Sequence, residues 1–305
     1  MELINFKDYL KLNKNDKLVA ALGEFDCFHL AHQKLINKTI EIAKELKYKS
    51  AVITFDPHPF EIIKKQKIQI SSLMDKENYL KNLKIDYLIV IDFDEQTVKL
   101  SPKDFIDNYL LKLNLKIAVA GFDFSFGYKG EGKISDIEKL SNGLIKTVTI
   151  EEQKHNGNKI GSTLIRKMLL EGDIKNLDLI LGHKLSLLAK VIKGHGIGHT
   201  IGVPTANLEF FGHLCLKEGV YAVKVKYQND IFPAMLNVGH NESFNKYNNL
   251  SYEVHIINFN SNLYDEVIEV IFYDYVRSEI HFDSIEDFKK QIEIDKNKII
   301  FILLE

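Results

Sequence analysis

The chain has 305 residues, of which 45% are hydrophobic and 27% charged, a composition typical of folded globular proteins and not of disordered ones. Domains usually contain roughly 100 to 200 residues, so this length predicts two of them. The net charge of −2 argues against a general electrostatic attraction to nucleic acid or to an anionic membrane. Any phosphate ligand must therefore be held by a locally built site.

Neither a membrane nor an oxidising compartment is indicated. Charges interrupt residues 1–12, and no apolar run approaches the ~18 residues that span a bilayer. Cys27 and Cys215 lie far apart and lack the spacing of metal or disulfide motifs. We expect a cytoplasmic protein with reduced thiols.

From about residue 17 to about residue 180, short apolar runs alternate with amphipathic stretches. This is the βαβ pattern of a parallel sheet with flanking helices. Strands are predicted over 18–22, 51–55, 87–91 and 117–120. Helices are predicted over 30–46 and from Pro102, which suits a first helical turn. Ligands of such sheets bind beyond the carboxyl ends of the strands.

After about residue 182, apolar residues recur at every second position, over 221–226, 252–257 and 267–273. This period predicts an antiparallel sheet or barrel. Ser284 precedes an amphipathic segment that reaches residue 296, which predicts a capped closing helix. We therefore predict a first domain over residues 1–180 and a second over 183–305.

A pair of histidines follows the first predicted strand of the sheet. His29 and His32 are three residues apart at the head of the 30–46 helix, where backbone N–H groups and the helix dipole favour anions. Two imidazoles there can hydrogen-bond phosphate oxygens as charge builds in a transition state. Taken alone, the pair is also compatible with two histidines that cap a surface helix.

Three further motifs lie where a predicted strand ends or a helix begins. They are Phe-Asp-Pro-His-Pro at 55–59, Gly-Phe-Asp-Phe-Ser-Phe-Gly at 121–127 and Gly-Ser-Thr-Leu-Ile-Arg at 161–166. Singly they could be a turn, a core aromatic pair and a helix cap. Together with the histidine pair, they resemble the bacterial FAD synthetase family of bifunctional riboflavin kinases and FMN adenylyltransferases.

The resemblance implies an α/β nucleotidyltransferase fold of the HIGH type, in which His29 and His32 are catalytic. It assigns ATP binding to Gly23, Asp26, Ser162, Thr163 and Arg166. It assigns FMN binding to His58, Asp123 and Phe126.

Two glycines of the family's histidine motif are replaced here, by Cys27 and Ala31. Glycine usually stands where backbone φ is positive or where a ligand presses on the backbone. Because both histidines are present, we expect weaker or slower adenylylation rather than none.

The second half carries a glycine-rich stretch followed by Pro204-Thr205-Ala206-Asn207. Its glycines, which would let backbone N–H groups approach phosphates, are Gly194, Gly196, Gly198 and Gly202. The Thr205 hydroxyl and the Asn207 carbonyl are the hard oxygen ligands that Mg²⁺ prefers. A glycine-rich hairpin with a polar turn is the plainer alternative.

This string resembles the Pro-Thr-Ala-Asn motif of riboflavin kinases, which fold as a β-barrel with a C-terminal helix. Glu253 lies in a Glu-Val-His string that is similar to one in riboflavin kinases. The resemblance implies that Glu253 is the general base that takes the proton of the riboflavin 5′-hydroxyl. Ile197 and His199 stand where the family often has arginine, so we expect weaker ATP binding by the kinase.

The expected function is phosphorylation of riboflavin to FMN by ATP and Mg²⁺, followed by adenylylation of FMN to FAD. Alternatives are an adenylyltransferase with a weak or inactive kinase domain, a flavin-binding regulatory protein, or a cytidylyl- or pantetheine-type transferase with an unrelated barrel. Joint retention of His29, His32, Thr205, Asn207 and Glu253 favours the enzyme. Its partners should be flavins and ATP rather than nucleic acid or membrane, and the chain a monomer or weak homo-oligomer.

Overall fold

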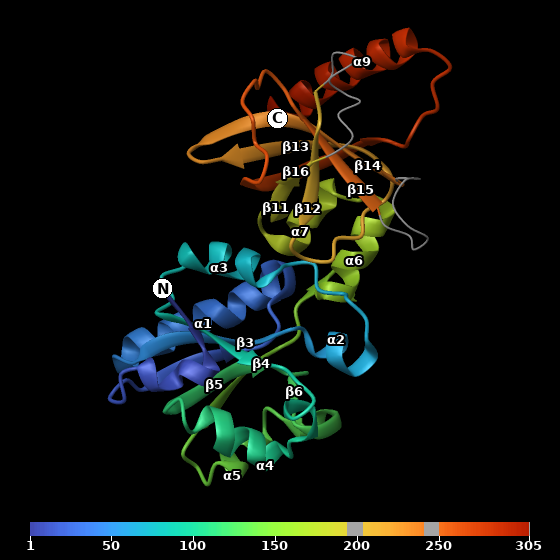
Figure 1. Cartoon of the computed structure of the whole chain (residues 1–305). Helices are drawn as coiled ribbons and strands as arrows, with labels where there is room; N and C mark the ends of the chain where they lie inside the picture. The colour runs from blue at the N-terminus through green and yellow to red at the C-terminus, as the bar shows by residue number, and fades with distance from the viewer. Residues whose placement is uncertain (194–203, 241–249, 305) are drawn as a thin grey trace. The chain divides into compact units, whose positions relative to one another are not determined.

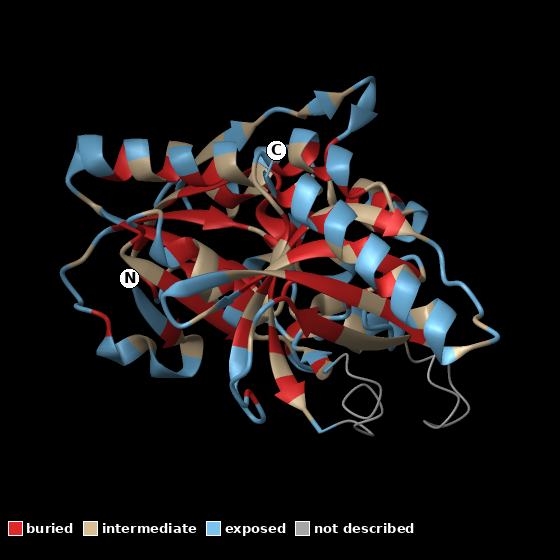
Figure 2. Ribbon diagram, turned by 90° about the horizontal axis from the view of Figure 1, so that it is seen from above, coloured by how far each residue is buried: buried red, intermediate tan, exposed pale blue. Residues whose placement is uncertain are grey.

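The computed structural model describes residues 1–193, 204–240 and 250–304. By their packing they form two compact units, each with its own core. The first unit contains Met1–Gln69 and Lys76–Gly161, and the second contains Ile70–Asp75 and Ser162–Glu305. Buried residues follow the strands of both units, while exposed residues line the outer faces of the helices (Figure 2).

The first unit is built on a six-stranded parallel sheet with the order β1-β4-β3-β2-β5-β8. Its strands are β1 (Glu2–Asn5), β2 (Leu18–Leu22), β3 (Lys49–Asp56), β4 (Tyr87–Asp92), β5 (Leu115–Gly121) and β8 (Lys146–Ile150). The four predicted strands lie within β2 to β5, which confirms the parallel sheet. The outer strands β1 and β8 were not predicted.

Helices cover both faces of this sheet (Figure 1). Helix α1 (Leu30–Leu46) coincides with the predicted helix and buries Leu35, Ile36 and Ile42 on the side that faces the strands. On the other face lie α4 (Pro102–Phe105), η4 (Ile106–Leu110) and α5 (Asp136–Leu140), whose apolar side chains share one core with β2 and β5. Pro102 begins α4, as predicted, behind the capping side chain of Ser101.

Other short elements of this unit connect the strands. They are η1 (Phe6–Lys11), η2 (Asp26–Phe28), α2 (Pro59–Lys64), α3 (Leu73–Lys81), η3 (Thr97–Lys99), β6 (Ser125–Phe126), η5 (Tyr128–Gly130), β7 (Gly132–Lys133), β9 (Lys154–His155) and β10 (Asn158–Lys159). The first three residues of α3 are grouped with the second unit. Several lie at the carboxyl ends of the strands, where the predicted ligand loops are.

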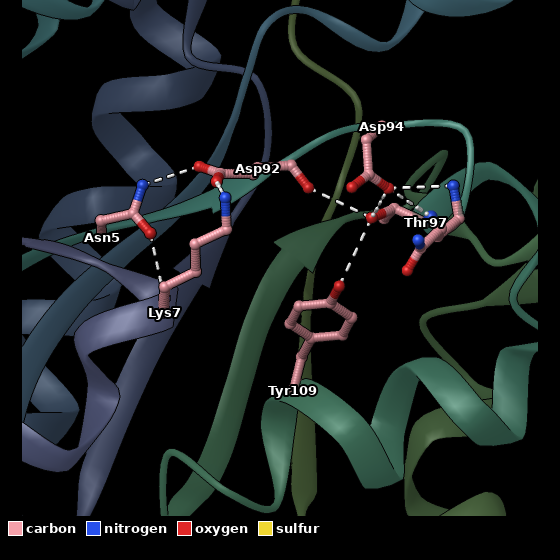
Figure 3. A network of polar contacts seen from close by, with 7 residues as sticks. Asn5, Lys7, Asp92, Asp94, Thr97 and Tyr109 are labelled. Carbon is pink, nitrogen blue, oxygen red and sulfur yellow. Dashed lines mark hydrogen bonds and ion pairs between the residues drawn. The ribbon is translucent and has the colours of Figure 1, made fainter.

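A polar network fixes the carboxyl end of β4 to the beginning of the chain (Figure 3). The Asp92 carboxylate accepts a 2.6 Å hydrogen bond from the Asn5 side chain and forms an ion pair with Lys7. Its backbone carbonyl accepts a 3.1 Å hydrogen bond from the Thr97 hydroxyl. Because β1 is short, it forms few backbone hydrogen bonds with β4, and these side-chain bonds add to them.

The second unit contains a closed antiparallel barrel with the order β11-β12-β15-β14-β13-β16. Its strands are β11 (Ser186–Ile192), β12 (Ala206–Phe210), β13 (Gly219–Tyr227), β14 (Asp230–His240), β15 (Leu250–Ile256) and β16 (Val267–Arg277). The predicted period-2 runs correspond to β13, β15 and β16, which confirms an antiparallel barrel.

Helix α9 (Ile285–Leu304) closes the second unit and packs across the barrel (Figure 1). Its buried Ile292, Ile299 and Leu303 contact Val220 and Met235 on the outer surface of the strands. The predicted helix began at Ser284, whose hydroxyl accepts a 3.1 Å hydrogen bond from the Asp287 amide and so caps it. The helix continues beyond the predicted end.

Further elements of the second unit precede the barrel. They are α6 (Ser162–Glu171), η6 (Lys175–Leu177) and α7 (Asp178–Leu181). Asp75 belongs to the same unit and its carboxylate accepts a 2.7 Å hydrogen bond from the Leu188 amide of β11. No helix within the described residues is long and apolar enough to cross a membrane. Cys27 and Cys215 are both free thiols.

We predict that Asp92→Asn lowers the free energy of unfolding of the first unit by about 1 kcal/mol, because the charged contact with Lys7 is lost. The hydrogen bond from Lys7 lowers the pKa of Asp92 below its usual value of 3.8. The stabilisation is therefore complete when the pH is above the pKa that Asp92 has in the unfolded chain. It is lost as the pH falls through the lower pKa that Asp92 has in the folded chain. Urea denaturation of both proteins between pH 7 and pH 3 measures the difference.

Asp107→Asn is the matched control, because Asp107 pairs only with Lys103 on the exposed surface of the same unit. Its cost should stay below about 0.5 kcal/mol. Equal costs for the two variants at pH 7 would show that the Asp92 network contributes no more than an ordinary surface pair.

Two candidate active sites

The loop after β2 holds the histidine pair in an unusual backbone conformation. Phe25, Cys27 and Phe28 have positive φ angles of 53°, 57° and 44°. The loop is nevertheless packed, because Asp26 is 1% exposed and the Phe28 ring stacks on Tyr79 with 4.2 Å between centroids. Buried side chains thus compensate for the strained backbone and fix where α1 begins.

His29 caps the amino end of α1, and its Nδ1 accepts a 3.3 Å hydrogen bond from the backbone amide of His32. In that tautomer the Nε2 atom carries the proton and can donate to an anion. The two imidazole rings stack with 3.6 Å between centroids. The Nδ1 atom of His32 is buried and has no hydrogen-bond partner among the described residues.

Both imidazoles are neutral at pH 7. Burial lowers the pKa of His29 to about 4. Burial also lowers the pKa of His32 well below 6.5, and the neighbouring His29 and Lys76 charges act in the same direction. The site therefore offers hydrogen bonds and the positive end of a helix, rather than two fixed cations.

The structure brings the Pro-His-Pro loop next to the histidine loop. His58 caps α2, and its Nε2 atom lies 3.9 Å from the Glu24 carboxylate. Asp123 forms an ion pair with Lys159, and both charges act on His29. Gly23 lies between β2 and this loop, with the Phe25 ring against it.

Other predicted ligand residues are placed differently. Phe126 is 4% exposed and packs in the core against Phe105 and Phe124, so its contact with FMN remains a prediction. Ser162, Thr163 and Arg166 begin α6 of the second unit. That these three residues share one site with His29 and His32 of the first unit also remains a prediction.

In the barrel, four polar residues lie close together on and beside neighbouring strands. The Thr205 hydroxyl, just before β12, lies 3.4 Å from the Glu253 carboxylate of β15. Asn207 of β12 and Asn237 of β14 are the ladder partners of Glu253 on its two sides. The glycines Gly194, Gly196, Gly198 and Gly202, together with Ile197 and His199, lie outside the described residues.

A cavity of about 990 Å³ opens beside Glu253 and Thr205. Met235, Phe282 and Phe288 are among its apolar walls, and Asn237 and Arg277 are among its polar groups. Its size and mixed lining suit an organic ligand with a flat apolar body and a few hydrogen-bonding groups. Glu253 and His255 both line it, which agrees with the predicted alternation along β15.

The hydroxyl of Thr205 and the amide oxygen of Asn207 are a donor set that suits Mg²⁺, which keeps several waters and needs few protein ligands. His255 supports this segment, because its Nδ1 atom lies 2.8 Å from the Pro204 carbonyl and can donate to it. No cluster of three or more His, Cys, Asp or Glu side chains suited to a metal ion occurs in the described part of the chain.

Arg277 is anchored beneath the cavity by α9. Its Nε atom donates to both carboxylate oxygens of Asp295 at 3.1 and 2.9 Å, and an Nη atom adds a 2.7 Å bond. Gln291 donates a further 2.9 Å bond to the same carboxylate. The Asp295 side chain is 2% exposed, so its buried carboxylate joins α9 to Arg277 of β16.

Comparison with known proteins finds two family models that match successive parts of the chain. The family model described as FAD synthetase matches residues 11–164, and the one described as riboflavin kinase matches residues 181–303. A bifunctional riboflavin kinase/FMN adenylyltransferase from Listeria monocytogenes is 37% identical over 96% of this chain and 93% of the relative. The chain belongs to the bifunctional riboflavin kinase/FMN adenylyltransferase family.

Another member of the family, from Bacillus subtilis, is 36% identical over 97% of this chain and 96% of the relative. Among solved structures, one from Streptococcus pneumoniae described as a macrolide-efflux protein is 29% identical. It has a TM-score of 0.85 and covers 97% of this chain and 98% of that one. That chain has a closely similar fold over its whole length.

Sequence reasoning missed several groups around both family sites. Arg277 lines the barrel cavity, and Glu24 and Lys76 lie beside the histidine loop. Asn237, which also lines the cavity, belongs to an Asn-Val-Gly string that matches the kinase family, but the sequence assigned it no role. Lys76 gave no signal, because a lysine in a polar helix ordinarily faces water.

We predict that Arg277→Met and Asp295→Asn each lower the free energy of unfolding of the barrel unit by about 3 to 5 kcal/mol. The first substitution leaves the Asp295 carboxylate without its counter-charge, and the second does the same to the Arg277 guanidinium. Urea denaturation of the barrel unit measures the cost. Lys290→Met is the control, since Lys290 lies on the same helix with a 76% exposed side chain.

The double variant Arg277→Met/Asp295→Leu should recover much of the loss, because it removes both charges. A single-variant cost no larger than that of Lys290→Met would contradict the anchoring role.

Proposed function

We propose that this chain makes FMN from riboflavin in its barrel unit and FAD from FMN in its N-terminal unit, using ATP in both reactions. The observation that carries the proposal is that this one chain contains two separate sets of reactive side chains. One is the neutral, stacked His29–His32 pair at the head of α1. The other is Glu253 beside Thr205 at a large cavity.

In the first centre, an oxygen of the FMN phosphate attacks the α-phosphorus of ATP, and pyrophosphate leaves. His29 donates from Nε2 to a nonbridging oxygen as negative charge grows there. His32 fixes that tautomer through its backbone amide and stacks on the ring. Gly23, Asp26, Ser162, Thr163 and Arg166 are proposed to hold ATP, and His58, Asp123 and Phe126 to hold FMN.

In the second centre, the isoalloxazine ring of riboflavin occupies the cavity, and the 5′-hydroxyl of the riboflavin side chain approaches Glu253. The carboxylate takes the hydroxyl proton as the oxygen attacks the γ-phosphorus of ATP, and ADP leaves. Thr205 and Asn207 are proposed to hold Mg²⁺, which supplies charge neutralisation for the triphosphate when bound. Gly194, Gly196, Gly198 and Gly202 are proposed to contact the ATP phosphates.

We assign adenylyl transfer to a domain over residues 1–180 and riboflavin phosphorylation to a domain over residues 183–305. The proposal also includes a cytoplasmic location, small-molecule partners rather than nucleic acid, and a monomer or weak homo-oligomer. Both thiols are free, as a reducing compartment requires.

We expect the purified chain, incubated with riboflavin, ATP and Mg²⁺, to yield FMN first and FAD afterwards. Chromatography of the three flavins over time measures both steps. FAD formed from supplied FMN, without FMN formed from riboflavin, would leave an adenylyltransferase with an inactive kinase. Tight flavin binding without either product would indicate a regulatory protein instead.

We predict that variants separate the two activities. His29→Ala or His32→Ala should lower FAD formation from FMN by about 100-fold or more, because donors to the transition state are lost or misplaced. Glu253→Gln should lower FMN formation by about 100-fold with riboflavin binding retained, because the amide cannot accept the proton. Steady-state kinetics with each flavin substrate are the measurement.

Each variant is the control for the other centre, since both act in the same folded chain. Loss of both activities in either variant would contradict the assignment of two separate sites.

A further inference from the structure

Lys76 is a lysine with almost no contact with water. It lies on α3, belongs to the first unit and is 1% exposed. Its Nζ atom donates a 3.2 Å hydrogen bond to the Thr54 hydroxyl of β3. Thr54 in turn donates a 3.4 Å hydrogen bond to the Glu24 carbonyl in the loop after β2. A chain of hydrogen bonds therefore connects α3, β3 and the loop that leads to His29.

Burial of an ammonium group is costly unless negative charge lies close by. The negative charges of Glu24, Asp26 and Asp56 favour the charged form of Lys76, while burial, the largest effect, lowers its pKa. Asp26 is itself 1% exposed, and the Oε2 atom of Glu24 is buried without a hydrogen-bond partner among the described residues. Neither these acids nor the lysine would be stable here as isolated charges.

The charge of the same ammonium also acts on one member of the histidine pair. Its charge acts on His32 and helps to keep that imidazole neutral, while Asp123 and Lys159 act on His29. Burial raises the pKa of Glu24 to about 7, Lys76 opposes that rise, and Asp26 and Asp56 add to it. The protonation states beneath the loop thus depend on one another.

We propose that Lys76 is a positioning residue for FAD formation, whose buried ammonium balances the carboxylates of Glu24 and Asp26 and so holds the loop carrying His29 and His32. This rests on the function proposed above. The loop needs such support, because Phe25, Cys27 and Phe28 all have positive φ angles. Tyr79, one turn after Lys76 on α3, supports the same loop through Phe28.

The test compares Lys76→Met, Glu24→Gln and the double variant Lys76→Met/Glu24→Gln. Lys81→Met is the matched control, because Lys81 lies on the same helix, has a 58% exposed side chain and forms an ion pair with Glu77 on the surface. For each protein, kcat and KM for FAD formation from FMN are measured between pH 6 and pH 9. Riboflavin phosphorylation is measured in the same preparations.

Lys76→Met should lower kcat for FAD formation by about 10-fold or more and alter its pH profile, because a displaced loop misaligns the histidines. The double variant Lys76→Met/Glu24→Gln should have a kcat at least about threefold higher than that of Lys76→Met, because it also removes the carboxylate that has lost its counter-charge. Lys81→Met should behave as wild type. Riboflavin phosphorylation should be unchanged in every variant.

A second readout is independent of activity. The imidazole of His32, followed by NMR and assigned with His32→Ala, should titrate at a higher pH in Lys76→Met than in wild type, because a nearby positive charge is gone. An unchanged titration together with wild-type kcat would overturn the proposal. So would a double variant that is no more active, or no better folded, than Lys76→Met.

Failure of the proposed function is distinguishable from failure of this inference. If wild-type protein makes no FAD from FMN and ATP, the function is wrong whatever the variants do. If wild-type protein makes FAD and Lys76→Met does so equally well at every pH, only the role of Lys76 is wrong.

Discussion

The cost of burying charge is the constraint on which both candidate sites depend. An ion removed from water loses several kcal/mol of solvation unless oppositely charged or hydrogen-bonding groups replace it. Lys76 meets this requirement with Thr54 and the carboxylates around the histidine loop. Arg277 meets it with Asp295 under the barrel cavity. The partners lie on α3, β3 and the loop after β2 in the first unit, and on β16 and α9 in the second, so this requirement fixes how those elements pack.

Apolar packing alone would not give that precision. The core shared by β2, β5 and the helices α4 and α5 stabilises the sheet, but hydrophobic contact is non-directional. Hydrogen bonds between charged groups act over a narrow range of distances and angles. The reactive side chains lie beside these directional contacts, at the end of β2 and on β15, rather than within the apolar cores.

Regular elements could be predicted from the sequence where apolar periodicity was strong. Each of the strands β2 to β5 contains a short apolar run, and α1 has one buried stripe. Strand β1 escaped prediction because it is short and lies at the sheet edge, where only Ile4 is fully buried. Its pairing depends on the backbone of β4 and on the Asp92 network, which no local pattern reveals.

The candidate sites were predictable where a motif carried them and not where tertiary packing did. His29, His32 and Glu253 stood in recognisable strings. Lys76 lies in a polar stretch with no periodic signal, and its burial follows from the meeting of α3 with β3. Phe126 packs against Phe105 in the core, and its predicted contact with FMN stays a prediction. An aromatic side chain in a loop motif can serve packing as readily as recognition.

The two replaced glycines of the histidine motif differ in kind. Cys27 has a φ of 57°, so the backbone there adopts the left-handed conformation that glycine accepts without cost. A cysteine in it costs about 1 kcal/mol, which burial of the thiol offsets in part.

Ala31 lies in the first turn of α1 and is not among the residues with positive φ, so its backbone needs no glycine. Any effect of its methyl group must therefore come from contact with a bound ligand. The loop after β2 can adopt its shape despite both replacements because the buried groups beneath it, rather than glycine alone, hold that shape.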